Sequence, residues 1–148
     1  MTEHEFPEYW YHGSNQKFDD FSIEHMGKNW HQSELGIYFT QYMKPPPFSS
    51  TAKEYAEEMV RREGGNPYIY KCIINFENPL ILDSNGWYSS NTYIDQNRKD
   101  IKRWIENDDH DCVIAYDFEN KDGIEWSDFI LATKNIDMIE IVDRFEYQ

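Results

Sequence analysis

The chain has 148 residues, which fits a single domain over residues 1–148 and suffices to bury a core without disulfide bonds. Hydrophobic residues make up 39% and aromatic residues 17%, which argues against a disordered chain. The formal net charge of −14 repels phosphate backbones, so direct nucleic-acid binding is not expected. That charge favours a basic partner protein, or it serves only to keep the chain soluble.

Targeting and metal-binding patterns are not found in this sequence. There is no signal-peptide pattern and no membrane-spanning apolar run, so we expect a cytoplasmic protein with reduced cysteines. Cys72 and Cys112 lack metal-ligand spacing, and the histidines show no paired spacing, so no metal site is expected. The acidic run 108–111 lacks the glycine and terminal glutamate of an EF-hand, so it is expected to be a solvated loop.

The N-terminal third reads as two short strands separated by loops. An aromatic strand is expected over residues 8–12, stopped by Gly13. A long polar loop with scattered apolar anchors follows over residues 14–34, and loops of this length are usually functional. A second strand is expected over residues 36–40. The proline-rich segment 41–49 then excludes regular structure.

The middle of the chain reads as a helix followed by strands. Thr51 and Glu54 form a capping box, which predicts a helix that ends near Arg62. Alternating apolar residues over 68–76 predict a long strand, and a short strand is expected over 80–82.

The C-terminal third completes an α+β pattern. Isoleucines at helical spacing predict an amphipathic helix near residues 93–106, and short strands are expected over 113–116, 129–133 and 138–142. Strands dominate and do not alternate regularly with helices, which indicates a mostly antiparallel or mixed sheet. No Gly-x-Gly-x-x-Gly motif is present, so any dinucleotide would bind without the Rossmann device.

His12 and Gly13 are candidate ligand-binding residues at the end of the first strand. A neutral imidazole can exchange a hydrogen bond with a ribose hydroxyl, and a glycine backbone can approach a flat carboxamide closely. The alternative is a strand-end histidine beside a turn glycine.

Two tyrosines are candidates for stacking on a planar ligand. Tyr38 lies in the second strand, and Tyr55 lies in the first turns of the helix, where it could cover the opposite face of the same ring. Core packing is the alternative for both. Ser50 and Thr51 offer hydroxyls to a carboxamide, although Thr51 is also the best helix cap.

Asp128 immediately precedes an apolar strand near the C-terminus. A carboxylate at the mouth of a sheet can stabilise a developing oxocarbenium cation or act as a general base. The alternative is an exposed aspartate, and Glu125 is a rival carboxylate.

These motifs occur in an order that resembles a known family. The order is Tyr11-His12-Gly13-Ser14, Gly36-Ile37-Tyr38-Phe39, Ser50-Thr51-Ala52 with Tyr55, and Asp128-Phe129-Ile130-Leu131. It resembles the diphtheria-toxin and poly(ADP-ribose)-polymerase branch of the ADP-ribosyltransferase superfamily, in the small versions found in phage and mobile-element proteins. The resemblance spans roughly residues 9–142 and implies a split α+β fold, with two main helices, that grips NAD as substrate.

The resemblance also implies roles for individual residues. His12, Tyr38 and Asp128 are implied to be catalytic and to converge around one nicotinamide riboside, and the NAD contacts are implied to come from His12, Gly13, Ser14, Tyr38, Thr51 and Tyr55. Asp128 stands where the family usually has a glutamate and is one methylene shorter, which leaves open transfer, NAD hydrolysis or inactivity.

The implied activity is mono-ADP-ribosylation of a protein, in the manner of a phage-encoded inhibitor of a bacterial defence system, such as an anti-CRISPR. One alternative is an NAD glycohydrolase toxin. The other is an inactive transferase fold whose acidity mimics nucleic acid and occupies a basic groove of its partner.

Overall fold

A computed structural model describes residues 6–21, 35–41, 52–83, 94, 96–121 and 124–146, with the backbone alone for residues 117–121 and 124–128. Its helices are α1 (Ala52–Glu63) and α3 (Arg98–Asp108), and a short 3₁₀ helix covers Ile136–Met138. Its strands are β1 (Trp10–Ser14), β2 (Ile37–Thr40), β3 (Tyr68–Ile74), β4 (Pro79–Asp83), β5 (Cys112–Lys121), β6 (Ile124–Thr133) and β7 (Ile139–Glu146). Within these residues, no helix is long and apolar enough to cross a membrane.

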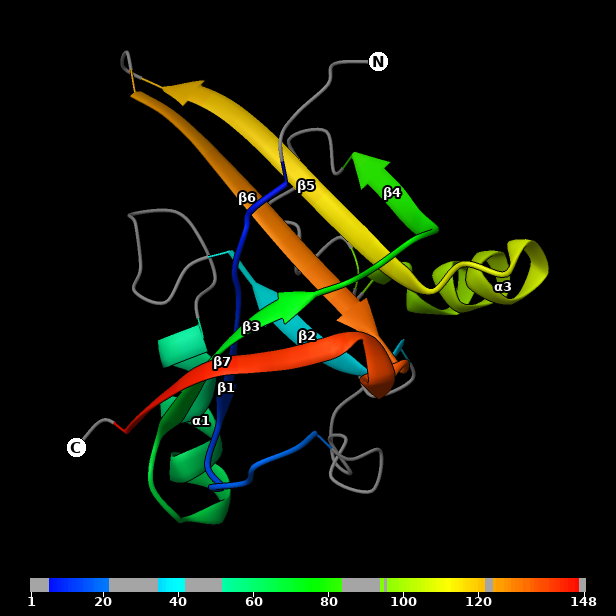
Figure 1. Ribbon diagram of the computed structural model, residues 1–148. Coiled ribbons are helices and arrows are strands. Elements are labelled where there is room, and N and C mark those ends of the chain that lie inside the picture. The colour runs from blue at the N-terminus through cyan, green and yellow to red at the C-terminus, as the bar shows by residue number, and fades with distance from the viewer. Residues whose placement is uncertain are drawn as a thin grey trace.

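The seven strands form one mixed sheet in the order β4-β5-β6-β2-β1-β3-β7, which confirms the predicted α+β class (Figure 1). The β4–β5 pair is parallel, and the remaining neighbours are antiparallel. A single residue pair, Tyr11 opposite Thr40, joins β1 to β2. The sheet therefore divides at this joint into two halves, β4-β5-β6-β2 and β1-β3-β7.

Two apolar cores hold the two half-sheets and α3 together. The first core combines side chains from both halves and is rich in aromatic rings; its largest buried members are Trp10, Phe39, Tyr70, Ile114, Phe129 and Leu131. The second core lies between the β4-β5-β6-β2 half and α3, and includes Ile101, Val113, Ile130 and Ala132. Neighbouring residues of β6 alternate between the two cores, as the two-residue period of a strand requires.

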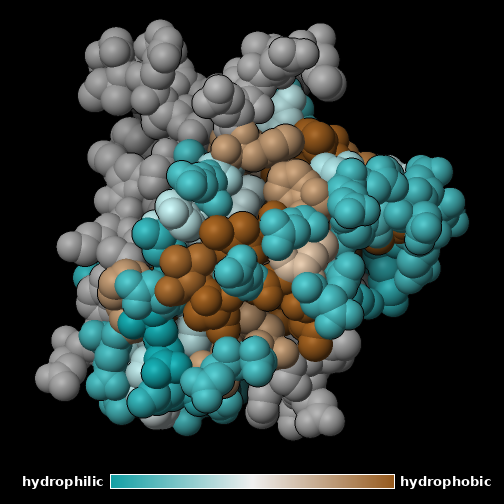
Figure 2. Space-filling view, in the orientation of Figure 1, coloured by the Kyte–Doolittle hydropathy of each residue, from teal (hydrophilic) through white to brown (hydrophobic). Residues whose placement is uncertain are grey.

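The other helix, α1, packs on β1 and β3 rather than on the half that contacts α3. Figure 1 shows the two helices far apart, at opposite ends of the sheet. Apolar side chains reach the surface over β3 and β7 in Figure 2. On β7, Ile139 and Ile141 are half-buried against the first core, and Val142 is exposed.

Several strands extend further than the sequence predicts, and β7, for example, ends at Glu146 rather than at residue 142. The first strand does not stop at Gly13, because Gly13 and Ser14 pair with Ile69 and Tyr68 of β3. A neighbouring strand thus supplies the ladder hydrogen bonds that local sequence could not reveal.

A further difference is a long hairpin formed by β5 and β6. Pairing with β4 ends at Tyr116 and pairing with β2 ends at Ile130, whereas β5 and β6 pair with each other down to Lys121 opposite Ile124. Within the described residues, the far part of the hairpin is a two-stranded arm, visible at the upper left of Figure 1. We define residues 117–128 as the β5–β6 arm.

The acidic run after α3 has a structural role, which corrects the expectation of a solvated loop. Asp109 has a left-handed backbone (φ 55°) that ends the helix. The Asp111 Oδ2 atom accepts hydrogen bonds from the backbone N–H groups of Glu77 (2.6 Å) and Asn78 (3.1 Å). The carboxylate therefore fixes the turn between β3 and β4, as an oxygen acceptor for otherwise unsatisfied N–H groups.

Cys72 and Cys112 are both free and buried. Burial raises the pKa of the Cys72 thiol to about 12 and raises the pKa of Cys112 as well. Neither thiol is therefore a reactive thiolate near neutral pH. Among the described residues, no group of three or more potential ligands could hold a metal ion.

Candidate active site

The joint between the two half-sheets brings together the first two sequence motifs. Tyr11 stands opposite Thr40. Continuing this antiparallel register sets His12 opposite Phe39 and Gly13 opposite Tyr38. Beyond Tyr11, however, the ladder between β1 and β2 stops, and the two strands separate at His12 and Gly13. We call this place the split.

The imidazole of His12 bridges the split. Its Nδ1 atom lies 2.7 Å from the carbonyl oxygen of Tyr38. A carbonyl oxygen only accepts hydrogen bonds, so Nδ1 must donate, and in the neutral ring Nε2 is then an acceptor. Phe21 and Phe39 flank the ring, with centroids at 5.2 and 5.5 Å.

His12 is kept neutral by these surroundings. Burial lowers the pKa of the imidazole from 6.5 to about 4, and the Tyr38 carbonyl opposes that shift only in part. Among the described residues, the imidazole has one hydrogen-bond partner, the Tyr38 carbonyl oxygen at Nδ1. The Nε2 atom is therefore a hydrogen-bond acceptor suited to a hydroxyl group, from mildly acidic pH upward.

This neutral histidine predicts a specific dependence of stability on pH. Because the pKa is lower in the folded chain, the unfolded chain binds more protons between pH 4 and pH 6.5. The contribution of His12 to the free energy of unfolding should be at its full value above pH 6.5. It should fall towards pH 4, by up to about 3 kcal/mol. Urea unfolding at several pH values should show that fall in the natural chain, and much less of it in His12→Asn. Parallel stability curves for the two chains would contradict the assignment.

Gly13 is the place where α1 touches the sheet. A Cβ atom added there would lie 2.0 Å from the carbonyl oxygen of Ala52 and 2.7 Å from the nitrogen of Ala56. Both alanines are fully buried. The first two turns of α1 thus rest directly on the backbone of β1, which only glycine permits.

The two rings of the first two motifs lie on opposite faces of the sheet. Tyr38 packs against the second core, with Leu35 and Ala132, whereas His12 contacts rings of the first core. The two rings were expected to converge around one nicotinamide riboside; in the structure they lie on opposite faces and are joined by the hydrogen bond from Nδ1 to the Tyr38 carbonyl. The register explains it, because adjacent residues of a strand point to opposite faces, and His12 stands opposite Phe39, not Tyr38.

The remaining predicted residues are described to different extents. The Ser14 Oγ atom accepts a hydrogen bond from the Gln16 backbone N–H (3.1 Å), and the phenolic oxygen of Tyr55 is buried. Thr51 lies outside the described residues. For Asp128 the backbone is described: it stands in β6 opposite Asp117 of β5, two residues before the partner of Thr40.

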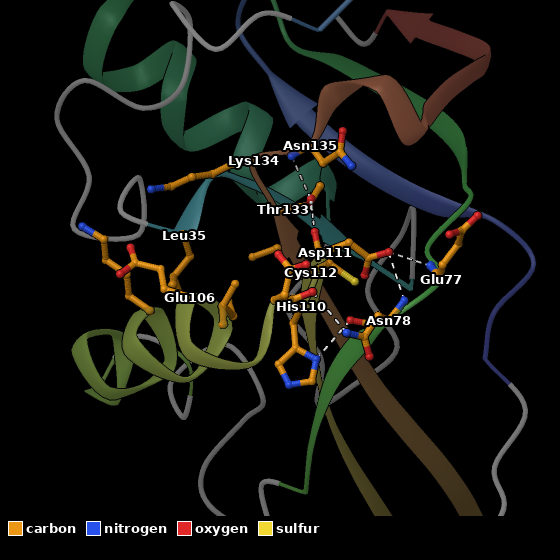
Figure 3. Close-up of a pocket in the computed structure, with 14 residues that line it drawn as sticks. Leu35, Glu77, Asn78, Glu106, His110, Asp111, Cys112, Thr133, Lys134 and Asn135 are labelled. Carbon is orange, nitrogen blue, oxygen red and sulfur yellow. Dashed lines mark hydrogen bonds between the residues drawn. The ribbon is translucent and has the colours of Figure 1, made fainter.

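A separate cavity of about 610 Å³ lies at the other end of β6 (Figure 3). Its wall comes from α3, the residues that follow this helix, and the chain around Thr133 and Lys134. None of the residues predicted to contact NAD lines it. The Asp111 and His110 side chains are already bound to the β3–β4 turn, through Glu77 and Asn78, as the dashed lines in Figure 3 show.

The family of the chain follows from a match over residues 6–142, which contain both motifs of the split and Asp128. The matching family model is described as "ADP-Ribosyltransferase in polyvalent proteins". The chain belongs to this ADP-ribosyltransferase family. No match was found among curated proteins or among solved structures. Membership of the ADP-ribosyltransferase family indicates ADP-ribosylation as the general activity, and confirms the superfamily inferred from the order of the motifs.

Sequence reasoning missed some residues around the split in this ADP-ribosyltransferase domain. Phe21 was expected only as an anchor of a loop, yet it covers the ring of His12. Tyr70 was expected only as a residue of the strand over 68–76, and Arg144 lies beyond the strand expected over 138–142, yet both bind the segment that carries Phe21. The alternation over 68–76 predicted a strand through Tyr70, but the partners of the Tyr70 hydroxyl lie more than 50 residues away along the chain.

Proposed function

We propose that the protein is a mono-ADP-ribosyltransferase that transfers ADP-ribose from NAD to a side chain of another protein. The observation that carries the proposal is the split, where His12, Gly13 and Tyr38 meet within a chain of the ADP-ribosyltransferase family. NAD is the substrate, and the split is where it binds.

The nicotinamide lies on the face of the sheet that Gly13 and Tyr38 share. There the phenol ring offers a stacking surface, and Tyr55 belongs to the first turns of α1, which rest on this face at Gly13. The carboxamide takes backbone hydrogen bonds at Gly13, where the ladder to β2 has ended. His12 lies on the other face. Its Nδ1 donates a hydrogen bond to the Tyr38 carbonyl, and its Nε2 accepts a hydrogen bond from a ribose hydroxyl.

The reaction is a dissociative substitution at the anomeric carbon. The bond from C1′ to nicotinamide breaks, nicotinamide leaves with the electron pair, and the ribose becomes an oxocarbenium cation. Asp128 stabilises this cation and accepts the proton of the acceptor nucleophile as the new bond to C1′ forms. Water in place of the side chain gives NAD hydrolysis through the same steps.

Charge supports a basic protein as the acceptor. The whole chain carries −14, and the β5–β6 arm contains five acidic residues, Asp128 among them, against one lysine. A positively charged acceptor is attracted to such a surface, and its approach along the arm leads to Asp128. We further propose that the acceptor is a protein of a bacterial defence system, that the chain is made by a phage, and that it acts in the cytoplasm of the infected cell.

Labelled NAD added to a bacterial lysate tests the proposed activity. We expect a labelled protein band that depends on the purified chain and disappears with Tyr38→Ala, since the variant loses the stacking surface worth about 1–3 kcal/mol. Tyr9→Ala is a matched control, because Tyr9 packs under Lys71, away from the split, and should leave the band unchanged.

Two outcomes of this assay would contradict transfer to protein. Free ADP-ribose without a labelled band, in every lysate tested, would indicate an NAD glycohydrolase. Unchanged NAD, together with salt-sensitive binding to a basic protein, would indicate an inactive acidic mimic of nucleic acid.

A further inference from the structure

The segment 15–21 follows β1 and runs along the first core to Phe21, and two strands hold it. Its backbone has no ladder partner in the described chain, so side chains satisfy its polar groups. Tyr70 of β3 donates its hydroxyl hydrogen to the Gln16 carbonyl (2.7 Å) and accepts the Phe18 N–H (2.9 Å). Arg144 of β7 donates to the Phe18 carbonyl (3.0 Å) and lies 3.4 Å from Asp19 Oδ1.

These contacts set the position of Phe21. The Phe18 ring stacks on Tyr70, with centroids 4.1 Å apart and planes at 8°. Phe21 then packs edge-on against Phe18 (4.9 Å), against Tyr70 (5.7 Å) and against His12 (5.2 Å). Tyr70 is fully buried and Phe21 nearly so, which makes the arrangement part of the core rather than a surface contact.

We propose that Tyr70 and Arg144 are positioning residues for His12: they fix segment 15–21 so that Phe21 covers the imidazole and Nε2 remains its hydrogen-bond acceptor. This proposal rests on the proposed function, in which Nε2 receives a ribose hydroxyl. Neither residue touches NAD in this account. Both act through Phe18 and Phe21.

The low pKa of His12 is consistent with a cover of this kind, because burial is its largest cause. The elements around His12 carry these charged and titratable groups: Lys17, Asp19 and Asp20 in segment 15–21, Tyr38 in β2, Tyr68, Tyr70, Lys71 and Cys72 in β3, and Glu140, Asp143, Arg144 and Glu146 in β7. Asp19 and Arg144 pair with each other. Uncovering the ring should therefore act mainly by admitting water, which raises the pKa towards 6.5.

The test is an NMR titration of the histidine ring carbons and nitrogens, with the His12 signals assigned from His12→Asn. In the natural chain, His12 should show no titration above pH 5, and Nδ1 should be the protonated nitrogen. In Tyr70→Phe, which keeps the ring stack but removes both hydroxyl hydrogen bonds, the midpoint should rise by about one pH unit or more. Arg144→Gln, at a partly exposed site that does not threaten the fold, should shift it in the same direction by less.

Tyr68→Phe is the matched control. Tyr68 lies two residues from Tyr70 on the same strand, but its hydroxyl interacts with Glu146 and Asn66 rather than with segment 15–21. In the Tyr68→Phe variant, the titration curve of His12 should coincide with that in the natural chain. The proposal is overturned if Tyr70→Phe and Arg144→Gln both leave the His12 midpoint where it is in the natural chain.

Enzyme kinetics separates this proposal from the proposed function. If Tyr70→Phe restores a pKa near 6.5, its KM for NAD should rise about tenfold between pH 8 and pH 5.5, whereas the natural chain should show little change. A shifted His12 titration without any NAD cleavage would leave the positioning roles standing and end the proposed function. NAD cleavage together with an unshifted His12 titration in the variants would contradict the positioning roles and leave the proposed function standing.

Discussion

Asp128→Asn is expected to lower kcat for ADP-ribosyl transfer by about 10²–10³-fold, with little change in KM for NAD. The substitution removes the negative charge that stabilises the oxocarbenium cation, and it retains nearly the same volume. Because this interaction forms only as the bond to nicotinamide stretches, its loss falls on kcat and not on the binding of NAD. Steady-state release of nicotinamide from purified protein measures both constants.

Asp117→Asn is the control for the loss of charge. Asp117 stands directly opposite Asp128 in the β5–β6 hairpin, so the change in local charge is the same. It should lower kcat by much less, since Asp117 has no contact with the ribose in the proposed mechanism. Equal losses in the two variants would show that the acidic arm acts as a whole and would remove Asp128 from its catalytic role.

Asp128→Glu tests the difference of one methylene from the usual residue of the family. If the aspartate holds its carboxylate at some distance from C1′, the longer side chain should raise the ratio of labelled protein to free ADP-ribose. A misplacement near 1 Å can change rates about 10²-fold, so the change in the ratio should be easily measured. A lower ratio would indicate that the backbone of this chain is already adjusted to aspartate.

Gly13→Ala is expected to lower the free energy of unfolding by about 3 kcal/mol. The new methyl group would meet the Ala52 carbonyl oxygen at 2.0 Å and the Ala56 nitrogen at 2.7 Å. Both are backbone atoms of a helix, which cannot move away as a flexible side chain can. In a chain of this size, that loss corresponds to a fall of about 6–12 °C in Tm. Thermal unfolding followed by circular dichroism measures it.

Ser14→Ala provides the comparison at the next residue of β1. It removes one hydroxyl group, which accepts the Gln16 N–H at an exposed position, and adds no volume. It should cost about 0.5–1.5 kcal/mol. If the two variants were equally stable, α1 would not be seated on Gly13, and the placement of Tyr55 near the nicotinamide would lose its support.

The strands and helices with clear periodicity could be predicted from the sequence. The second strand, α1 and the alternating run of β3 were all expected close to where they occur. The hairpin arm was not expected, because residues 117–128 are rich in acidic residues, which are poor strand formers. Its cause is non-local: β5 and β6 continue to pair after their other neighbours have ended.

The motifs of the candidate site could be found from the order of residues, but their orientation could not. His12 and Tyr38 are 26 residues apart, and only the register Tyr11 opposite Thr40 decides which faces their rings occupy. The close packing of α1 on Gly13 also depends on a contact with residues about 40 positions later in the chain. Tertiary pairing, rather than local sequence, sets these features.

In the proposed function, nicotinamide binds at the split, on the face that Gly13 and Tyr38 share. A crystal structure with an NAD analogue whose nicotinamide–ribose bond cannot be cleaved tests it most directly. We expect the nicotinamide ring to stack on Tyr38, its carboxamide to bind the Gly13 backbone, and a ribose hydroxyl to lie at His12 Nε2. An analogue bound elsewhere, for example in the cavity beside α3, with the split unchanged, would contradict it.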